Sequence, residues 1–298
     1  MRLGLFSVSY AGLWGQHALS APAFIRKAGA LGYEGVLLMA KRPHLSVLDA
    51  GADELREIEA ALDGAGVQLI GLAAYNDFLL KGAAELPVLE MQLSYVRECI
   101  GLTRRLGGGL VRVFTGYERA DEPYQRQWAG LVAALRECGR MAEDEGIVIA
   151  VQNHHDLAVD SEAMARLLDE VGMPNVRAGY DAWSPALRGE ELEAGALDMA
   201  PRTAMTIAAD YCRLPRWRYV PSLVNYERLE PDLVQAVAMG EGFIDYDGFF
   251  SALERGGFDG WAVYEMCSPL AGGPSEANLD AKAAAFVAWM RARERGRP

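Results

Sequence analysis

Short apolar runs alternate along the chain with longer stretches in which apolar residues recur at helical spacing. The short runs are rich in Val, Ile and Leu, which is typical of parallel strands covered on both faces. Eight such runs predict eight strands: Leu3–Val8, Gly35–Met39, Val67–Leu72, Leu110–Phe114, Ile147–Val151, Val176–Tyr180, Ala204–Ala209 and Trp261–Tyr264.

The stretches between these strands predict helices, because their apolar residues recur every three or four positions. The predicted helices are Pro22–Leu31, Ala52–Ala65, Leu89–Leu106, Gln125–Glu145, Ser161–Val171, Glu190–Ala200, Tyr246–Arg255 and Asn278–Arg293. A strand and a helix recur roughly every 30 residues without a break in composition, which favours one α/β domain. We therefore predict a single (β/α)8 TIM barrel over residues 1–298.

A doubly wound sheet is the alternative fold. It requires a glycine-rich phosphate turn after a strand. Gly107–Gly109 precedes a strand instead, so these glycines are better explained as the end of a helix. The barrel is the better prediction.

One segment, about residues 211–242, shows neither the apolar runs of a strand nor the apolar spacing of a helix. It is predicted to be a long irregular loop. It carries the basic cluster Arg213–Arg218, within which Arg216 is a candidate substrate-binding residue. Loops of this length in compact barrels are usually lids or oligomer contacts. We expect a lid that attracts an anion.

Charge and cysteine usage narrow the class of protein. The net charge of −12 argues against a nucleic-acid partner, whose phosphates would be repelled. No apolar stretch is long enough for a membrane span, and the N-terminus lacks a secretory signal. The cysteines are isolated and predict reduced thiols in the cytoplasm: Cys99, Cys138, Cys212 and Cys267. Nothing near Cys267 marks it as a nucleophile, so we expect it to be a packing residue.

Oxygen-bearing side chains end the last four predicted strands, and in a barrel these ends meet at one mouth. They are Gln152, Asp181, Asp210 and Glu265. Each aspartate alone is equally well explained as a helix cap or a turn former. Together the four oxygens suit a divalent ion such as Mg or Mn, with help from an imidazole.

Two of the four histidines, His154 and His155, are adjacent after the fifth predicted strand. Adjacent side chains on an extended segment face opposite ways, so only one can enter the site. His154 shares its facing with Gln152 and is the candidate. We expect His155 to be structural.

These residues resemble a known family. Asp181, the run Gly240–Tyr246, the run Gly257–Trp261 and Glu265 are similar to the xylose-isomerase-like sugar phosphate isomerase/epimerase superfamily. Gly32–Val36 and Asn153–His154 extend the resemblance to nearly the whole chain. The superfamily includes ketose epimerases, hydroxypyruvate isomerases, inosose dehydratases and enzymes that cleave oxidised C-glycosides. A related endonuclease-IV-type DNA repair barrel is excluded, because it needs a multi-histidine zinc cluster and a surface that tolerates DNA.

The resemblance implies one divalent metal held by Glu, Asp, His and Glu on strands five to eight. Asp181 and Glu265 match the second and fourth ligands, but Gln152 stands where the first glutamate would be and Ile207 where the histidine would be. An amide oxygen can bind a metal but cannot take a proton. We still expect Mn or Mg, with Asp210, a nearby histidine or water at the missing position.

The chemistry that the resemblance implies is proton abstraction next to a carbonyl, with the metal stabilising the enediolate. Glu265 is the candidate base. His154 is its candidate partner, because an imidazole titrates near the operating pH. One base and one acid suit an isomerisation, or a β-elimination such as dehydration or C-glycoside cleavage, better than a symmetrical epimerisation. A non-catalytic binding descendant is the alternative from another class.

Other polar residues near strand ends predict the substrate-binding shell of a small carbohydrate-like molecule. They are Lys41, Arg42, His44, Tyr75, Asp77, Arg112, Trp183 and Arg216. Lys41 and Arg42 suit a phosphate or carboxylate, or equally a solvated charge pair. Arg112 lies within a strand, where a lone charge is costly, so we expect a carboxylate partner such as Asp181 or Glu265. A homo-oligomer is possible.

Overall fold

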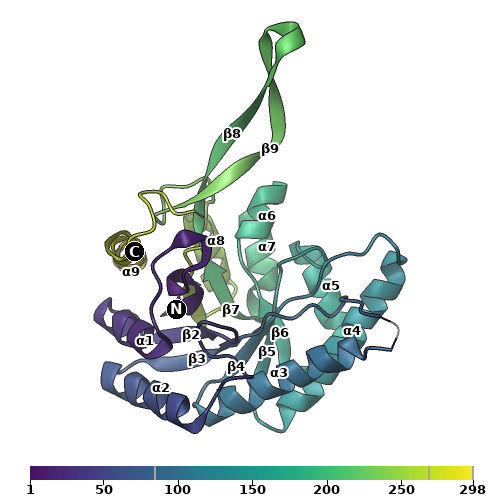
Figure 1. Ribbon diagram of the computed structural model, residues 1–298, viewed down its shortest axis with the longest axis vertical. Coiled ribbons are helices and arrows are strands. Elements are labelled where there is room, and N and C mark those ends of the chain that lie inside the picture. Colours follow the sequence, from purple (N-terminus) through teal and green to yellow (C-terminus); the bar gives the residue numbers. More distant parts are fainter. Residues whose placement is uncertain (84, 268, 297–298) are drawn as a thin grey trace.

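The predicted barrel is confirmed by a computed structural model, which describes residues 1–83, 85–267 and 269–296. Eight parallel strands close in the order β1-β10-β7-β6-β5-β4-β3-β2 (Figure 1). Their bounds are β1 (Arg2–Phe6), β2 (Gly35–Met39), β3 (Gln68–Ala73), β4 (Leu110–Val113), β5 (Val148–Gln152), β6 (Val176–Gly179), β7 (Thr203–Ala208) and β10 (Trp261–Tyr264). The pairing of β1 with β10, which aligns Leu3 with Ala262, closes the barrel.

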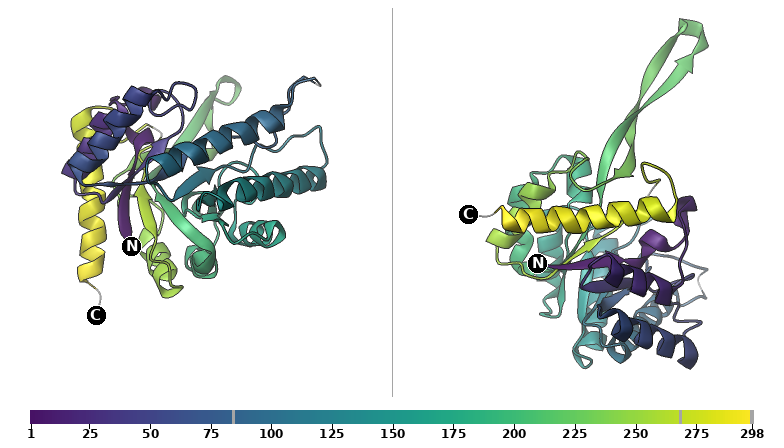
Figure 2. Two further views of the ribbon diagram at one scale, coloured as in Figure 1. Left: turned by 90° about the horizontal axis from the view of Figure 1, so that it is seen from below. Right: turned by 90° about the vertical axis from the view of Figure 1, so that its left-hand side faces the viewer.

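Helices cover the outside of the barrel (Figure 2). They are α1 (Ala21–Ala30), α2 (Ala52–Ala65), α3 (Val88–Arg105), α4 (Tyr124–Glu143), α5 (Ser161–Val171), α6 (Trp183–Arg188), α7 (Leu192–Met199), α8 (Tyr246–Arg255) and α9 (Glu276–Arg295). The side chains of Ser20, Asp160, Asp245 and Ser275 accept backbone N–H groups at four helix starts, as N-cap residues do. Sequence analysis missed α6, a short helix that ends at Arg188 with Gly189 as its C-cap.

Apolar strand residues fill two layers, which explains why the strands contain so few polar residues. One cluster lies inside the barrel and includes Phe6, Met39 and Val263. A second, larger cluster lies between the strands and the helices. In that outer layer, the α9 residue Phe286 stacks on Tyr264 of β10 at 4.6 Å between ring centroids. The last helix thus covers the strand that closes the barrel.

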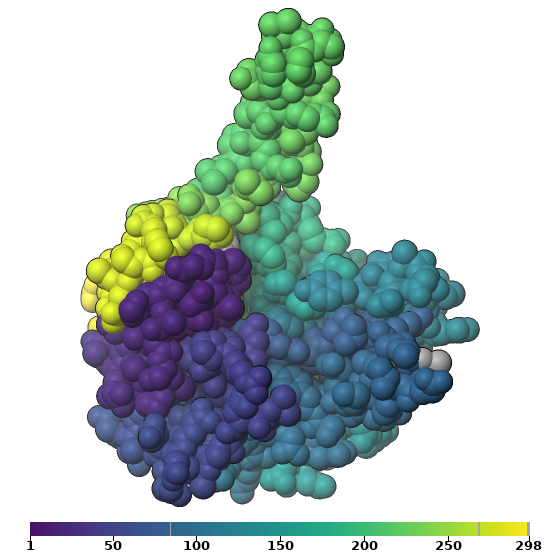
Figure 3. All heavy atoms as spheres, in the orientation of Figure 1, coloured from purple at the N-terminus to yellow at the C-terminus, as the bar shows by residue number. Residues whose placement is uncertain are grey.

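The segment predicted to be an irregular lid is instead a long β-hairpin. Strand β8 (Asp210–Val220) pairs with the antiparallel β9 (Asn225–Val237). This arm stands clear of the barrel (Figure 3). The prediction was wrong because the segment shows no alternating pattern of apolar residues. Its two prolines, Pro215 and Pro231, are nevertheless compatible with strands. They lie where the strand register shifts between Leu214 and Arg216, a position in which a hairpin tolerates proline.

The far part of the arm exposes several large apolar side chains: Trp217, Tyr219, Leu223, Val224 and Tyr226. The cations of the basic cluster are mostly engaged along the arm itself. Arg218, for example, pairs with Glu227 of the facing strand. The arm extends away from the barrel instead of folding over its mouth as the expected lid would (Figure 1). None of the helices in the described ranges is long and apolar enough to cross a membrane.

Gly71 of β3 should be intolerant of a side chain, because a Cβ there would lie 1.8 Å from the Leu110 carbonyl oxygen of β4. We expect Gly71→Ala to lower the free energy of unfolding by about 2 kcal/mol or more. Gly64, in α2, has no atom near the same position, so Gly64→Ala should stabilise the protein by about 0.5–1 kcal/mol. Urea unfolding of both variants measures the contrast. A neutral Gly71→Ala would contradict the observed packing of β3 against β4.

Candidate active site

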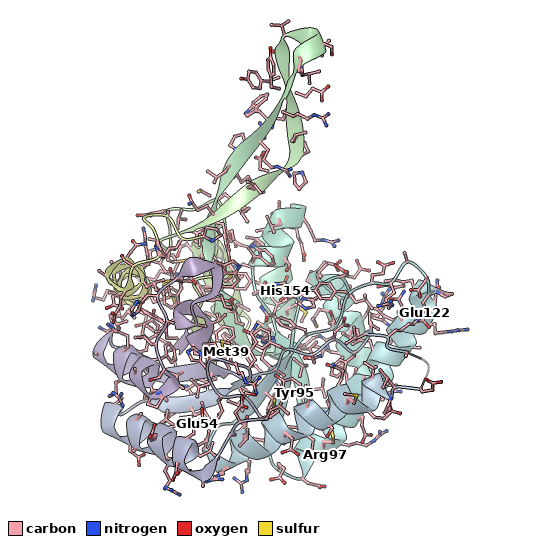
Figure 4. The ribbon with its side chains drawn as sticks, viewed as in Figure 1. Met39, Glu54, Tyr95, Arg97, Glu122 and His154 are labelled. Carbon is pink, nitrogen blue, oxygen red and sulfur yellow. The ribbon has the colours of Figure 1, made fainter. Side chains whose placement is uncertain are left out.

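A cavity of about 450 Å³ opens at the carboxyl ends of the barrel strands. Its lining includes Lys41, Tyr75, Arg112, His154 and Glu265, which follow or belong to five different strands. Figure 4 shows His154 near the middle of the molecule, whereas Glu54, Arg97 and Glu122 lie on its periphery. The mouth of the barrel thus gathers polar side chains, as expected for an active site of this fold.

A second, much smaller cavity of about 40 Å³ adjoins the first. Gln152, His154, Glu265 and Cys267 line both cavities, and Asp181, Trp183, Ile207 and Tyr211 line the small one. The structure therefore brings Gln152, Asp181 and Glu265 together from β5, β6 and β10, as the sequence analysis expected.

Asp181 is a buried carboxyl group with one unsatisfied oxygen. Its Oδ2 accepts a hydrogen bond of 2.8 Å from Nε2 of Gln152, while Oδ1 has no partner. Burial is the main reason that the pKa of Asp181 rises to about 7, and the nearby charge of Glu265 raises it further. Asn153 fixes the backbone here: its side chain accepts the Asp181 N–H and donates to the Asp181 carbonyl. Asp181 can therefore exchange a proton near neutral pH.

Glu265 follows β10 and borders both cavities. Its backbone N–H donates to the Ala208 carbonyl at 2.9 Å, which continues the pairing of β10 with β7. Burial raises the pKa of the Glu265 carboxyl, while a hydrogen bond from the Cys267 thiol and the positive charge of Arg112 act in the opposite direction. The two carboxyl groups of Asp181 and Glu265 thus hold their protons more tightly than free side chains.

His154 differs from the expectation in its protonation. Burial, reinforced by the neighbouring His155 and Arg112, lowers the pKa of His154 to about 3. Its Nδ1 accepts the backbone N–H of His155 at 2.6 Å, so the ring proton lies on Nε2. The prediction that this imidazole titrates near the operating pH is wrong. A neutral ring suits donation of a hydrogen bond to a substrate oxygen.

His155 also lines the large cavity, so the prediction that only one of the two histidines faces the site is wrong. Its φ of 74° breaks the alternation of an extended segment. The ring stacks between Phe114 and Tyr117, with centroid distances of 4.2 and 4.1 Å. Both imidazoles therefore contribute to one wall.

Asp210, predicted as a metal ligand, lies outside both cavities and has a structural role. Its Oδ2 accepts the N–H groups of Gly240 and Gly242, each at 2.9 Å, and its Oδ1 accepts the N–H of Tyr211. These bonds tie the base of the arm together. Gly242 is required there, because a Cβ would lie 1.9 Å from Oδ1 of Asp210.

The predicted substrate-binding residues divide into two groups. Lys41, Tyr75, Asp77 and Arg112 line the large cavity and Trp183 lines the small one.

The other three lie elsewhere. Arg42 turns outward and forms a bidentate pair with Asp49 at 2.5 and 2.6 Å. His44 is buried, with its ring nitrogens at hydrogen-bond distance from Ser7 and the Leu19 carbonyl, and Arg216 lies on the arm. The sequence places a residue near a strand end but does not tell which way the following turn points it.

Arg112 lacks the ion-pair partner that we expected. Its Nη1 donates to the Ala74 carbonyl at 2.8 Å, and its guanidinium lies 3.8 Å from the Phe114 ring centroid. Glu265 acts on it only through its charge. The buried guanidinium is thus held by a carbonyl and by aromatic rings.

Sequence analysis missed several residues of the site, among them Cys267 and Tyr211. Cys267 was expected to be a packing residue, yet it lines both cavities, and its Sγ lies 2.9 Å from the Tyr211 hydroxyl. Its position two residues after Glu265 was the available signal, because i and i+2 share a face in extended chain. Tyr211 had no such signal, since it was assigned to the loop.

With this geometry established, comparison with known proteins decides the family. The family model of the xylose isomerase-like TIM barrel matches residues 25–293. The chain belongs to this family. The resemblance to this superfamily that the sequence analysis found is therefore confirmed, together with the fold that it implies.

Individual relatives are more distant. The 2-epi-5-epi-valiolone 7-phosphate 2-epimerase of Actinoplanes sp. is 33% identical over 177 residues, which are 58% of this chain and 61% of the relative. The match thus spans about three fifths of that relative's length.

Solved structures agree in fold. The D-allulose 3-epimerase of Methylomonas sp. in complex with D-allulose has a TM-score of 0.74 at 15% identity, covering 98% of this chain and 97% of its own. The 3-keto-D-glucoside 4-epimerase of E. coli has a TM-score of 0.74 at 16% identity, covering 98% and 99%.

The raised pKa of Asp181 predicts how stability depends on pH. The folded state holds a proton between pH 3.8 and about 7 that the unfolded state releases. Stability from this group is therefore present at low pH and is lost as pH rises to about 7. Asp181→Asn, which stays neutral, should exceed the wild type in unfolding free energy by only about 1 kcal/mol near pH 4.5. It should exceed the wild type near pH 7.5 by up to about 4 kcal/mol.

Urea unfolding at both pH values measures this difference. The exposed Asp63 of α2 provides the control, since the difference between Asp63→Asn and the wild type should not grow with pH in this way. A constant difference between wild type and Asp181→Asn at both pH values would mean that Asp181 is ionised throughout.

Proposed function

We propose that the protein is an isomerase or epimerase that moves a proton next to the carbonyl of a sugar-like hydroxy-carbonyl compound. The observation that carries this proposal is a pair of carboxyl groups, buried Asp181 and half-buried Glu265. Both line the small cavity, and Glu265 also lines the adjoining cavity of substrate size. The epimerase activity named for the Actinoplanes relative supports the same reaction class.

The side chains of this chain supply the parts that such a reaction needs. Glu265, which borders both cavities, takes the proton from carbon, and its raised pKa makes the carboxylate a stronger base. The Nε2–H of His154 donates a hydrogen bond to the carbonyl oxygen as negative charge develops there. Asp181, whose pKa is about 7, returns a proton to the intermediate. The buried rings of Phe114 and Tyr211, which line the large and the small cavity respectively, limit the access of water.

The residues present do not fit the four-ligand metal centre that the family resemblance implies. The Gln152 amide nitrogen donates to the very carboxylate that would bind the metal. Ile207 offers no ligand atom, and Asp210 is used by backbone N–H groups. Within residues 1–83, 85–267 and 269–296, no group of three or more His, Cys, Asp or Glu side chains could hold an ion. The steps above therefore use protein side chains alone.

A metal titration tests this mismatch. We expect Mn or Mg at about 1 mM to leave the melting temperature of the wild type unchanged. Gln152→Glu combined with Ile207→His restores the missing ligand types, so the double variant should gain stability with metal, about 2.7 kcal/mol at a concentration 100 times its Kd. Stoichiometric, tightly bound Mn or Mg in the purified wild type would show that these residues do hold a metal, as the sequence analysis predicted.

The oligomeric state and the cellular location form a separate part of the proposal. The exposed apolar side chains at the end of the arm support a homo-oligomer. All four cysteines are free and two of them are buried, which supports a cytoplasmic location.

Glu265→Gln tests the proposed reaction. The variant keeps the shape of the side chain but cannot accept the proton, so turnover should fall by about 100-fold or more with the fold intact. Proton NMR in deuterated water measures exchange of the hydrogen next to the carbonyl in ketoses and ketose phosphates. The exposed Glu241 provides the matched control, and Glu241→Gln should keep full activity.

The same spectra separate the reaction classes. An epimer or isomer supports the proposal, whereas loss of water or of an aglycone assigns the protein to the lyases. A fully active Glu265→Gln variant would rule out Glu265 as the base.

A further inference from the structure

Two positive side chains lie together in the large cavity, on the side formed by β2, β3 and β4. Lys41 follows β2, Arg112 lies in β4, and Tyr75 follows β3 between them. The Lys41 Nζ is 3.7 Å from the Tyr75 ring centroid, and the Arg112 guanidinium carbon is 5.1 Å from the same centroid. The two cations therefore share one aromatic ring as a common support.

Neither cation has a carboxylate partner among the residues that the structure describes. Arg112 is 1% exposed, donates to the Ala74 carbonyl and to the Tyr75 hydroxyl, and has no partner for its Nε. Burial lowers the pKa of Lys41, and the adjacent charge of Arg112 lowers it further. Two like charges held this close are unfavourable unless an anion joins them.

The acidic side chains of the large cavity are engaged elsewhere. Asp77 Oδ1 accepts the backbone N–H groups of Leu79 and Tyr117. Glu265 hydrogen-bonds with Cys267. Glu265 acts on Arg112 through its charge without an ion pair, and neither carboxylate pairs with Lys41. A bound anion would therefore supply the direct partner that both cations lack.

We infer that Lys41 and Arg112 form a subsite for an anionic group of the substrate, a phosphate ester or a carboxylate. This rests on the proposed function, since it places the charged end of the same substrate. Gln92 adds a third donor: its Oε1 accepts the Asp77 N–H at 3.0 Å, which leaves its amide NH2 free to face the cavity that it lines. Ammonium, guanidinium and amide groups are all donors, so the ligand that fits them offers acceptors only.

The order of strands separates this subsite from the proton-transfer groups. Asp181 follows β6 and Glu265 follows β10, whereas the cations belong to β2 and β4 on another part of the ring. A cavity of about 450 Å³ accommodates one sugar-sized molecule that spans both parts. The subsite would then fix which carbon of the substrate lies beside Glu265.

Binding of simple anions tests the subsite directly. Isothermal titration of the full chain with inorganic phosphate and with acetate should show binding to the wild type. Lys41→Gln should weaken it by about tenfold or more. The neighbouring Arg42 provides a matched control, because it pairs with Asp49 outside the cavity, and Arg42→Gln should bind as the wild type does. Tighter phosphate binding assigns a phosphate ester, and tighter acetate binding assigns a carboxylate.

Two further measurements keep this inference separate from the proposed reaction. Glu265→Gln should still bind phosphate, so a failure of the reaction leaves the subsite testable. Arg112→Gln should also weaken binding, and its circular dichroism shows whether it folds. Should it unfold, Lys41→Gln decides alone. Undetectable binding of both anions to the wild type, or unchanged binding to Lys41→Gln, would overturn the subsite.

Discussion

Closing eight parallel strands into a barrel creates an interior that side chains must fill, and this constraint decides where chemistry can occur. Apolar residues such as Met39, Ile207 and Val263 occupy that interior. Buried polar groups are costly without partners, so they collect where the strands end and the wall opens. Asp181 and Glu265 lie at that boundary. Asp181 is buried and Glu265 is half-buried, and both line the small cavity that adjoins the larger one.

The need to bury the strands on both faces also made most of the fold predictable from the sequence. Strands buried on both faces leave short apolar runs, and amphipathic helices leave a longer period, so the eight units and their order were predicted correctly. The arm was not, because its strands lie in solvent, where no buried face imposes an alternating pattern. Its prolines, Pro215 and Pro231, lie at a register shift in the hairpin.

At the site, the sequence predicted which residues lie at the strand ends better than it predicted which way their side chains point. Gln152, Asp181 and Glu265 meet as expected because register alone puts strand ends at one level. The directions of the Asp210 and His155 side chains depend on the backbone conformation just beyond the strand. The pattern of apolar residues contains no information about that conformation. The protonation of His154 and Asp181 depends on burial, and burial is a property of the assembled barrel.

The arm and the reacting groups are parts of one continuous element. Strand β8 starts two residues after β7 ends, and its second residue, Tyr211, lies in the wall of the small cavity. Tyr211 contacts the thiol of Cys267, which in turn hydrogen-bonds to Glu265. The hairpin therefore begins as part of the cavity wall, and a single thiol lies between its second residue and the proposed base.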